Sequence, residues 1–177
     1  LEIQPVKNLI AKSSFGYRMS AGSYRSFTPK YNLSQSSMNT IDKVSQSMSS
    51  GYSWTWENTI AYSTKINAHS ISALVGQSVE KWGMGENINA TNGYSLFDDF
   101  EHAWLDNTQN LTSGVTKVGG SPWGEGALAS FFGRVNYDYK ETYMATLVMR
   151  ADGSSNFARG HRWGYFPSVS AGWVLTN

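Results

Sequence analysis

Four acidic side chains lie close together near the middle of the chain, and paired carboxyl groups are the chemistry of glycoside hydrolysis. They are Asp98, Asp99, Glu101 and Asp106. Glycosidic cleavage needs two carboxyl groups on opposite sides of one bond, and closeness in sequence does not provide that geometry. We therefore expect a solvated loop here and not a catalytic pair.

Isolated histidines and a short Asp-Gly-Ser-Ser run are the other residues whose types suggest chemistry. The histidines are His69, His102 and His161, and no spacing of the H-x-x-H kind joins them, so they predict solvated side chains and no metal site. The run Asp152–Ser155 lacks the successive carboxylates and closing Glu of a calcium loop. It predicts a turn, in which Gly153 permits the bend and Asp152 or Ser154 bonds nearby amides. With no nucleophile elbow, phosphate loop or zincin motif, the sequence predicts neither an enzyme nor a cofactor.

The composition favours strands over helices. Aromatic residues make up 14% of the chain and charged residues only 15%, and Cys is absent. Aromatic, Thr and β-branched side chains suit a pleated surface. A net charge of +1 gives no electrostatic reason to expect a nucleic-acid partner. No apolar stretch is long enough for a transmembrane helix, and the start Leu1–Pro5 does not look like a signal peptide, so we expect an internal fragment of a longer chain.

Alternation with a period of two residues runs through several long segments. It is clearest in residues 7–21, 52–66 and 131–140, and weaker in 70–81, 143–152 and 165–175. In 52–66, for example, Tyr52, Trp54, Trp56, Ile60 and Tyr62 share one face. Strands of ten or more residues are long for a soluble domain. The pattern predicts an all-β chain of roughly six to eight strands.

Short and long connections alternate between these segments. Asn67–His69 and Lys140–Thr142 predict tight turns, whereas residues 22–50, 83–127 and 153–164 predict long polar loops. Outer-membrane barrels have short turns on one side and long loops on the other, and carry aromatic girdles near their strand ends. A strand of about 12 residues, tilted by about 40°, spans about 30 Å, enough for the apolar band. The predicted fold is therefore long antiparallel strands forming part of a transmembrane β-barrel.

A polar row follows the strand faces opposite the apolar ones. It contains Arg134, Asn136, Asp138, Arg150 and Asp152. These side chains either meet a solute or another domain in the barrel lumen, or simply satisfy one another in an interior that is polar in any case. If Arg134 and Arg150 lie on adjacent strands, we expect a cross-strand charge network.

Three ordered motifs lie near the end of the chain. Ser130–Tyr143 reads Ser-Phe-Phe-Gly-Arg-Val-Asn-Tyr-Asp-Tyr-Lys-Glu-Thr-Tyr, and Arg150–Phe157 reads Arg-Ala-Asp-Gly-Ser-Ser-Asn-Phe. Trp163–Trp173 reads Trp-Gly-Tyr-Phe-Pro-Ser-Val-Ser-Ala-Gly-Trp. In this order the three motifs resemble the barrel of the SusC/RagA group of TonB-dependent transporters. Pro5–Leu9 and Asn58–Ser63 look like weaker family segments. The family-motif residues that we expect to face the lumen are Arg134, Asn136, Asp138, Arg150, Asp152, Gly153, Ser154 and Ser155.

The resemblance implies a barrel of about 22 strands around a plug domain, in the outer membrane of a Gram-negative bacterium. The whole chain, residues 1–177, would be one segment of that barrel, and no part of it matches a plug or a TonB box. The implied partners are a SusD-like surface lipoprotein that acts as a lid, and TonB, which supplies energy. The implied solutes are oligosaccharides or peptides.

Aromatic residues in the long connection 83–127 are candidates for contact with the lid or the solute, because such rings fill protein interfaces and stack on sugars. The candidates are Trp82, Tyr94, Trp104 and Trp123. The same composition also suits a soluble all-β carbohydrate-binding module. Such a sandwich would have shorter strands, with its inner faces buried against each other.

Overall fold

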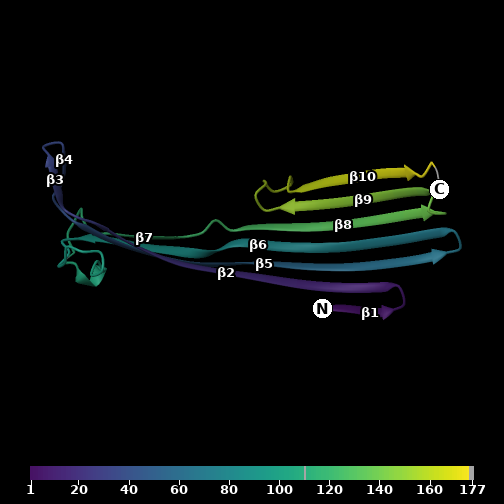
Figure 1. The fold of residues 1–177 in the computed structure, drawn as a ribbon, viewed down its shortest axis with the longest axis horizontal. Helices are drawn as coiled ribbons and strands as arrows, with labels where there is room; N and C mark the ends of the chain where they lie inside the picture. The colour runs from purple at the N-terminus through teal and green to yellow at the C-terminus, as the bar shows by residue number, and fades with distance from the viewer. Residues whose placement is uncertain (110, 176–177) are drawn as a thin grey trace. The chain divides into compact units, whose positions relative to one another are not determined.

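The computed structural model describes residues 1–109 and 111–175, and this part of the chain is mainly β-structure (Figure 1). Its strands are β1 (Glu2–Val6), β2 (Leu9–Thr28), β3 (Tyr31–Ser34), β4 (Ser37–Asn39), β5 (Lys43–Ile66), β6 (His69–Gly93), β7 (Lys117–Pro122), β8 (Gly126–Tyr139), β9 (Tyr143–Ser154) and β10 (Trp163–Trp173). A single 3-10 turn, η1 (Leu105–Asn107), interrupts them within the described residues. The prediction of an all-β chain is confirmed.

One sheet contains most of the strands, in the order β1-β2-β5-β6-β8-β9-β10, and β7 pairs with part of β6. The pairings β1 with β2, β6 with β8, β8 with β9 and β9 with β10 are antiparallel. Strands joined by a tight turn are neighbours in the sheet, as Figure 1 shows for β5 and β6 and for β8 and β9. Strands β3 and β4 form a separate hairpin.

The chain divides into two compact units. The sheet unit contains Leu1–Arg18, Ser53–Trp82 and Glu125–Asn177, and the loop unit contains Met19–Tyr52 and Gly83–Gly124. Strands β2, β5 and β6 contribute residues to both units.

Side chains in the sheet unit separate into two faces by residue parity. Phe131 pairs with Ala151 and Trp163 with Gly153, so the odd-numbered residues of β6, β8, β9 and β10 share one face. We call this the apolar face, and the opposite, even-numbered one the polar face. A Cβ on Gly76 would meet Thr59 of β5 at 2.9 Å, which places the odd-numbered residues of β5 on the polar face.

The apolar face is exposed in the structure. Tyr62 is 45% exposed, Val135 43% and Leu147 53%. The buried hydrophobic residues of the described chain are Val44, Met84 and Ala103, and all three lie in the loop unit. A sandwich would cover these side chains with a second large sheet, whereas the described residues form a single large one, so the sandwich fold of the alternative is wrong.

Aromatic rings form a row near each end of the apolar face. At one end Phe131 stacks on Trp163 with 6.0 Å between ring centroids. At the other, the centroid of Tyr143 lies 6.5 Å from that of Tyr139 and 6.2 Å from that of Trp173. Trp163 and Trp173 begin and end β10, so at about 3.3 Å per residue they are about 33 Å apart, or about 25 Å along an axis tilted by about 40°. That spacing equals the height of the apolar band of a membrane barrel.

Tight turns join the strand pairs on the side of the second row. β1–β2, β5–β6 and β8–β9 are connected through Lys7–Asn8, Asn67–Ala68 and Lys140–Thr142. Asn8, Asn67, Lys140 and Glu141 have φ between 52° and 67°, the left-handed conformation of tight hairpin turns. The predicted tight turns are confirmed.

The long connections contain more strand than the sequence analysis expects. β2 continues to Thr28, β5 begins at Lys43 and β6 continues to Gly93, so most of 22–50 and part of 83–127 are extended. The expectation of long polar loops is wrong there. These extensions are rich in Ser, Thr, Asn and Gly on both faces, so they lack the alternation that identifies a half-buried strand.

No helix in the described residues is long and apolar enough to cross a membrane.

Candidate functional site

Arg150, Asp152 and Ser130 form a connected polar cluster on β8 and β9. Arg150 Nε donates to both carboxylate oxygens of Asp152, at 2.9 and 2.8 Å, and its Nη2 donates to Ser130 Oγ at 3.2 Å. Ser130 is buried and lies opposite Asp152 in the register. The ring of Phe132 lies 5.8 Å from Arg150 Cζ. Because the charges of Arg150 and Asp152 neutralise each other, the main role of the cluster is to hold the side chains of the polar face in place.

Asn136 connects three strands through its side-chain amide. Its Nδ2 donates to Ser72 Oγ of β6 at 2.9 Å, and its Oδ1 accepts from Thr146 Oγ1 of β9 at 3.0 Å. Nearer the tight turn, the Asp138 carboxylate accepts the backbone N–H of Glu141 at 2.9 Å. The predicted polar row, apart from Arg134, is thus held together by local hydrogen bonds.

Arg134 takes part in none of the ion pairs between described residues. It lies on the strand next to Arg150, as the expected charge network requires, but its cross-strand neighbour is Val148. Arg150 pairs within its own strand instead. The expectation of a cross-strand charge network through Arg134 is wrong, since no acidic residue occupies the opposing position.

The predicted turn in Asp152–Ser155 begins only at Ser155, and the bend at Gly153 is wrong. Asp152, Gly153 and Ser154 belong to β9 and are paired with β8, and Gly153 also lies opposite Trp163. A Cβ on Gly153 would lie 2.8 Å from the Trp163 ring, so this glycine makes room for an aromatic side chain and not for a bend. Gly153 lies on the apolar face, whereas its two neighbours, Asp152 and Ser154, lie on the polar face.

The amide bonds expected around this run come from its serines. Ser154 Oγ accepts the N–H of Asn156 at 3.2 Å. Ser155, just beyond the strand, exchanges two bonds with Ala127: its Oγ accepts the Ala127 N–H at 2.8 Å, and its own N–H donates to the Ala127 carbonyl at 2.9 Å. These contacts fix the end of the β8–β9 pair.

Trp82 and Trp123 lie flat against glycines. Trp82 is opposite Gly126 in the register, and a Cβ on Gly126 would fall 2.4 Å from its ring. A Cβ on Gly51 or Gly85 would fall 2.1 or 2.7 Å from the ring of Trp123. Sequence reasoning missed these contacts, because each glycine and the ring that covers it are far apart in the sequence.

The other two aromatic candidates belong to a closed loop, residues 94–109, which we call the aromatic loop. Tyr94 has φ 57° and its carbonyl accepts the N–H of Gln109, which brings the two ends of the loop together. Trp104 is exposed and stacks on Arg25, whose Cζ lies 3.8 Å from its ring centroid and 4.6 Å from that of Phe100. Nothing in the sequence singles out Arg25 for this contact, since it lies on β2.

The acidic cluster is a solvated part of this loop, as expected. Asp99 accepts the backbone N–H of His102 at 2.9 Å and contacts its Nδ1 at 2.9 Å, and the His102 ring stacks on Phe97. The backbone N–H of His102 holds the pKa of Asp99 below its usual range, and the imidazole adds to that effect. No group of His, Asp or Glu among the described residues has the arrangement of a metal site.

Acidification is expected to loosen this turn. The pKa of Asp99 is lower in the folded loop than in an unfolded one, so its contribution is complete above the ordinary aspartate pKa and lost as pH falls through the lowered pKa. Hydrogen exchange of residues 96–106 in the full-length receptor, corrected for the intrinsic pH dependence, should rise in that range. In Asp99→Asn this pH dependence should be absent, and the exchange should exceed that of the wild type near neutral pH and match it in acid. Equal exchange in the two proteins near neutral pH would contradict this.

The other two histidines are exposed. His69 Nδ1 lies 2.7 Å from Tyr137 Oη, and its ring packs on Tyr139 with 4.8 Å between centroids, so it extends the aromatic row. His161 lies in the connection between β9 and β10, where its backbone N–H donates to the Ala158 carbonyl.

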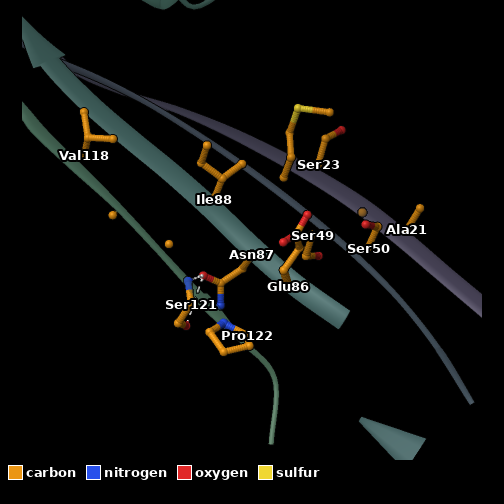
Figure 2. A pocket seen from close by; sticks show the side chains of 14 residues that line it. Ala21, Ser23, Ser49, Ser50, Glu86, Asn87, Ile88, Val118, Ser121 and Pro122 are labelled. Carbon is orange, nitrogen blue, oxygen red and sulfur yellow. Dashed lines mark hydrogen bonds between the residues drawn. The ribbon is translucent and has the colours of Figure 1, made fainter. Parts of the chain in front are cut away.

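A shallow groove of about 900 Å³ lies in the loop unit between β2, β5, β6 and β7 (Figure 2). Small residues such as Ala21, Gly120 and Ser50 line it beside Met48, Ile88 and Val118. Asn87 Oδ1 accepts the Ser121 N–H at 3.2 Å at one side of the groove. None of the residues predicted to be functional lines this groove.

Comparison with known proteins gives one consistent group of relatives, although no family model matches. The chain is 36% identical to TonB-dependent receptor P26 of Formosa agariphila over 128 residues, which are 70% of this chain and 12% of that receptor. It is 50% identical to TonB-dependent receptor SusC of Bacteroides thetaiotaomicron over 48 residues, 27% of this chain and 5% of SusC. The chain thus corresponds to a small part of these relatives.

The solved structure of the RagAB peptide transporter has the same fold. It superimposes with a TM-score of 0.81 and 24% identity, over 96% of this chain and 18% of that one. Three observations indicate the same group of proteins: the long antiparallel strands, the three motifs near the end of the chain, and the matched receptors. The chain belongs to the SusC/RagA-type TonB-dependent receptors.

Proposed function

We propose that this chain is part of the barrel wall of an outer-membrane importer. The observation that carries the proposal is the exposed apolar face with an aromatic row at each end, backed by a polar face of hydrogen-bonded side chains. Hydrocarbon is the solvent in which such a face is stable, and amphipathic rings are favoured where hydrocarbon meets water. In this arrangement the polar face, including Arg134, Asn136 and Arg150, lines the aqueous lumen.

The connections give the barrel segment its direction. Bacterial barrels have their short turns in the periplasm and their long loops outside the cell. Lys7–Asn8, Asn67–Ala68 and Lys140–Thr142 would therefore be periplasmic. The aromatic loop would be on the cell surface.

We further propose that the whole receptor imports oligosaccharides or peptides together with a SusD-like lipoprotein, with energy from TonB. The support is the membership of the family and the names of its members: one relative is a TonB-dependent receptor called SusC, and the structural neighbour is called a peptide transporter. The chain covers 12% of the P26 receptor and 18% of the RagAB chain, so this proposal concerns the complete protein.

Uptake by cells that carry or lack the full-length receptor tests the proposal. We expect the receptor in the outer-membrane fraction, and uptake of labelled oligosaccharides or of labelled peptides that disappears on deletion of the receptor or of TonB. Fractionation of the receptor with soluble proteins would contradict the membrane assignment. Undiminished uptake of both solute classes after deletion would contradict the importer assignment.

A further inference from the structure

The aromatic loop presents a patch of large exposed side chains. Phe100 is 54% and Trp104 47% exposed, and Leu96 and Phe97 beside them are also exposed. Each ring already has one face covered from within: Arg25 lies over Phe100 and Trp104, and His102 stacks on Phe97 at 4.7 Å. Aromatic residues fixed in this way at a surface are typical of protein interfaces.

Hydrogen bonds hold the loop in one conformation. Ser95 and Thr108 form a β-bridge that closes its ends. Two side chains outside the loop accept its backbone N–H groups. Asp42, just before β5, accepts the N–H of Ser95 at 2.9 Å, and Gln46 on β5 accepts the N–H of Leu105 at 2.9 Å. Inside the loop Ala103 is completely buried. A loop that is already ordered loses little conformational entropy when a partner binds.

The patch also carries unpaired negative charge. Asp98, Glu101 and Asp106 are exposed, and none of them is in an ion pair with a described residue. Residues 94–109 contain no Lys or Arg. One cationic group of the chain already binds to the loop: the Arg25 guanidinium lies against Trp104 and donates to the Glu101 carbonyl at 3.3 Å. A cationic group with apolar neighbours is complementary to the patch.

We propose that the aromatic loop is a docking surface for a basic, partly apolar face of the surface lipoprotein. This inference rests on the proposed function, which supplies that partner. Small solutes bind in concave sites that enclose most of their surface. The rings of the loop are about half exposed, which suits the broad surface of a protein better than an enclosed solute.

Charge neutralisation on the full-length receptor tests the proposal. The triple variant Asp98→Asn, Glu101→Gln, Asp106→Asn removes three carboxylates that make no hydrogen bond to a described residue. Binding of the purified, tagged lipoprotein in low salt should weaken about tenfold, the sum of three modest rim interactions. The wild-type affinity should fall as salt rises, and the affinity of the variant should depend on salt much less. Glu86→Gln, which removes an exposed carboxylate outside the loop, is the matched control and should bind like wild type.

The possible failures have different meanings. If the triple variant binds the lipoprotein with wild-type affinity and salt dependence, the docking proposal is wrong and the importer assignment stands. The docking proposal is also wrong if lipoprotein binding is kept while uptake of a Lys- and Arg-rich peptide is lost, since the loop then contacts the solute. If wild-type receptor binds no lipoprotein at any salt concentration, the partner in the proposed function is wrong as well.

Discussion

Leu147→Arg in the full-length receptor is expected to remove most of the folded protein from the outer membrane. Leu147 lies midway along β9, between Val135 of β8 and Val169 of β10, on the apolar face. Its side chain is 53% exposed, so the destabilisation does not come from a protein core. An arginine at the middle of the bilayer destabilises a barrel by about 2–4 kcal/mol. The measurement is the fraction of receptor in outer membranes that migrates as folded barrel on an unheated gel.

Ser170→Arg is the matched control for this substitution. Ser170 is exposed on β10 beside Val169, at nearly the same level as Leu147, but on the polar face. Its arginine should enter the aqueous lumen, and the receptor should assemble in nearly normal amounts. Equal assembly of the two variants would show that the apolar face does not contact lipid, and the membrane assignment would be wrong.

A methyl group on Gly85 or Gly51 is expected to destabilise the loop unit by about 1–3 kcal/mol, the usual effect of overpacking. The two sites differ in what the methyl group meets. At Gly51 the three nearest atoms all belong to the Trp123 ring, whereas at Gly85 the nearest two are backbone atoms, the Ser50 carbonyl oxygen and Gly51 Cα, at 2.6 and 2.7 Å. Trp123→Ala should therefore rescue Gly51→Ala to a large extent and Gly85→Ala only slightly.

Denaturant unfolding of the purified receptor, or protease resistance of this segment where unfolding is not two-state, measures both double-mutant cycles. Gly124→Ala is the control, because its methyl group would have no neighbour within 4 Å and should change nothing. Full rescue of both glycine variants by Trp123→Ala would indicate that the backbones of β5 and β6 are not as close as we describe.

The sequence was sufficient to predict those strands that have one apolar and one polar face. Where one face of a strand is apolar and the other polar, as in residues 131–140, alternation identified the strand and its faces. The tight turns followed from the short spacing between such strands. The same reasoning failed for the ends of β2, β5 and β6, since polar residues on both faces produce no alternation there.

The candidate site was predicted in its composition and only partly in its contacts. Arg150, Asn136 and Asp152 are on the polar face, as the alternation required. Their hydrogen-bond partners depend on which residues face each other across strands, and the register is not visible in one strand alone. That is why the expected network through Arg134 was wrong. The packing of Trp123 against Gly51 and of Arg25 against Trp104 was missed for the same reason.

The tight turn at Lys140–Thr142 limits how the gene can change. Both Lys140 and Glu141 are left-handed, and Tyr139 lies directly opposite Tyr143, so the turn has no slack. Inserting or deleting one codon there would exchange the two faces of β9, and would put Leu147 at the position of Val148 after an insertion or of Thr146 after a deletion. Length variation among descendants of this gene should therefore occur in steps of two residues at such hairpins. Between β9 and β10, where Ser155–Arg162 form a longer connection, any number of residues can be gained or lost.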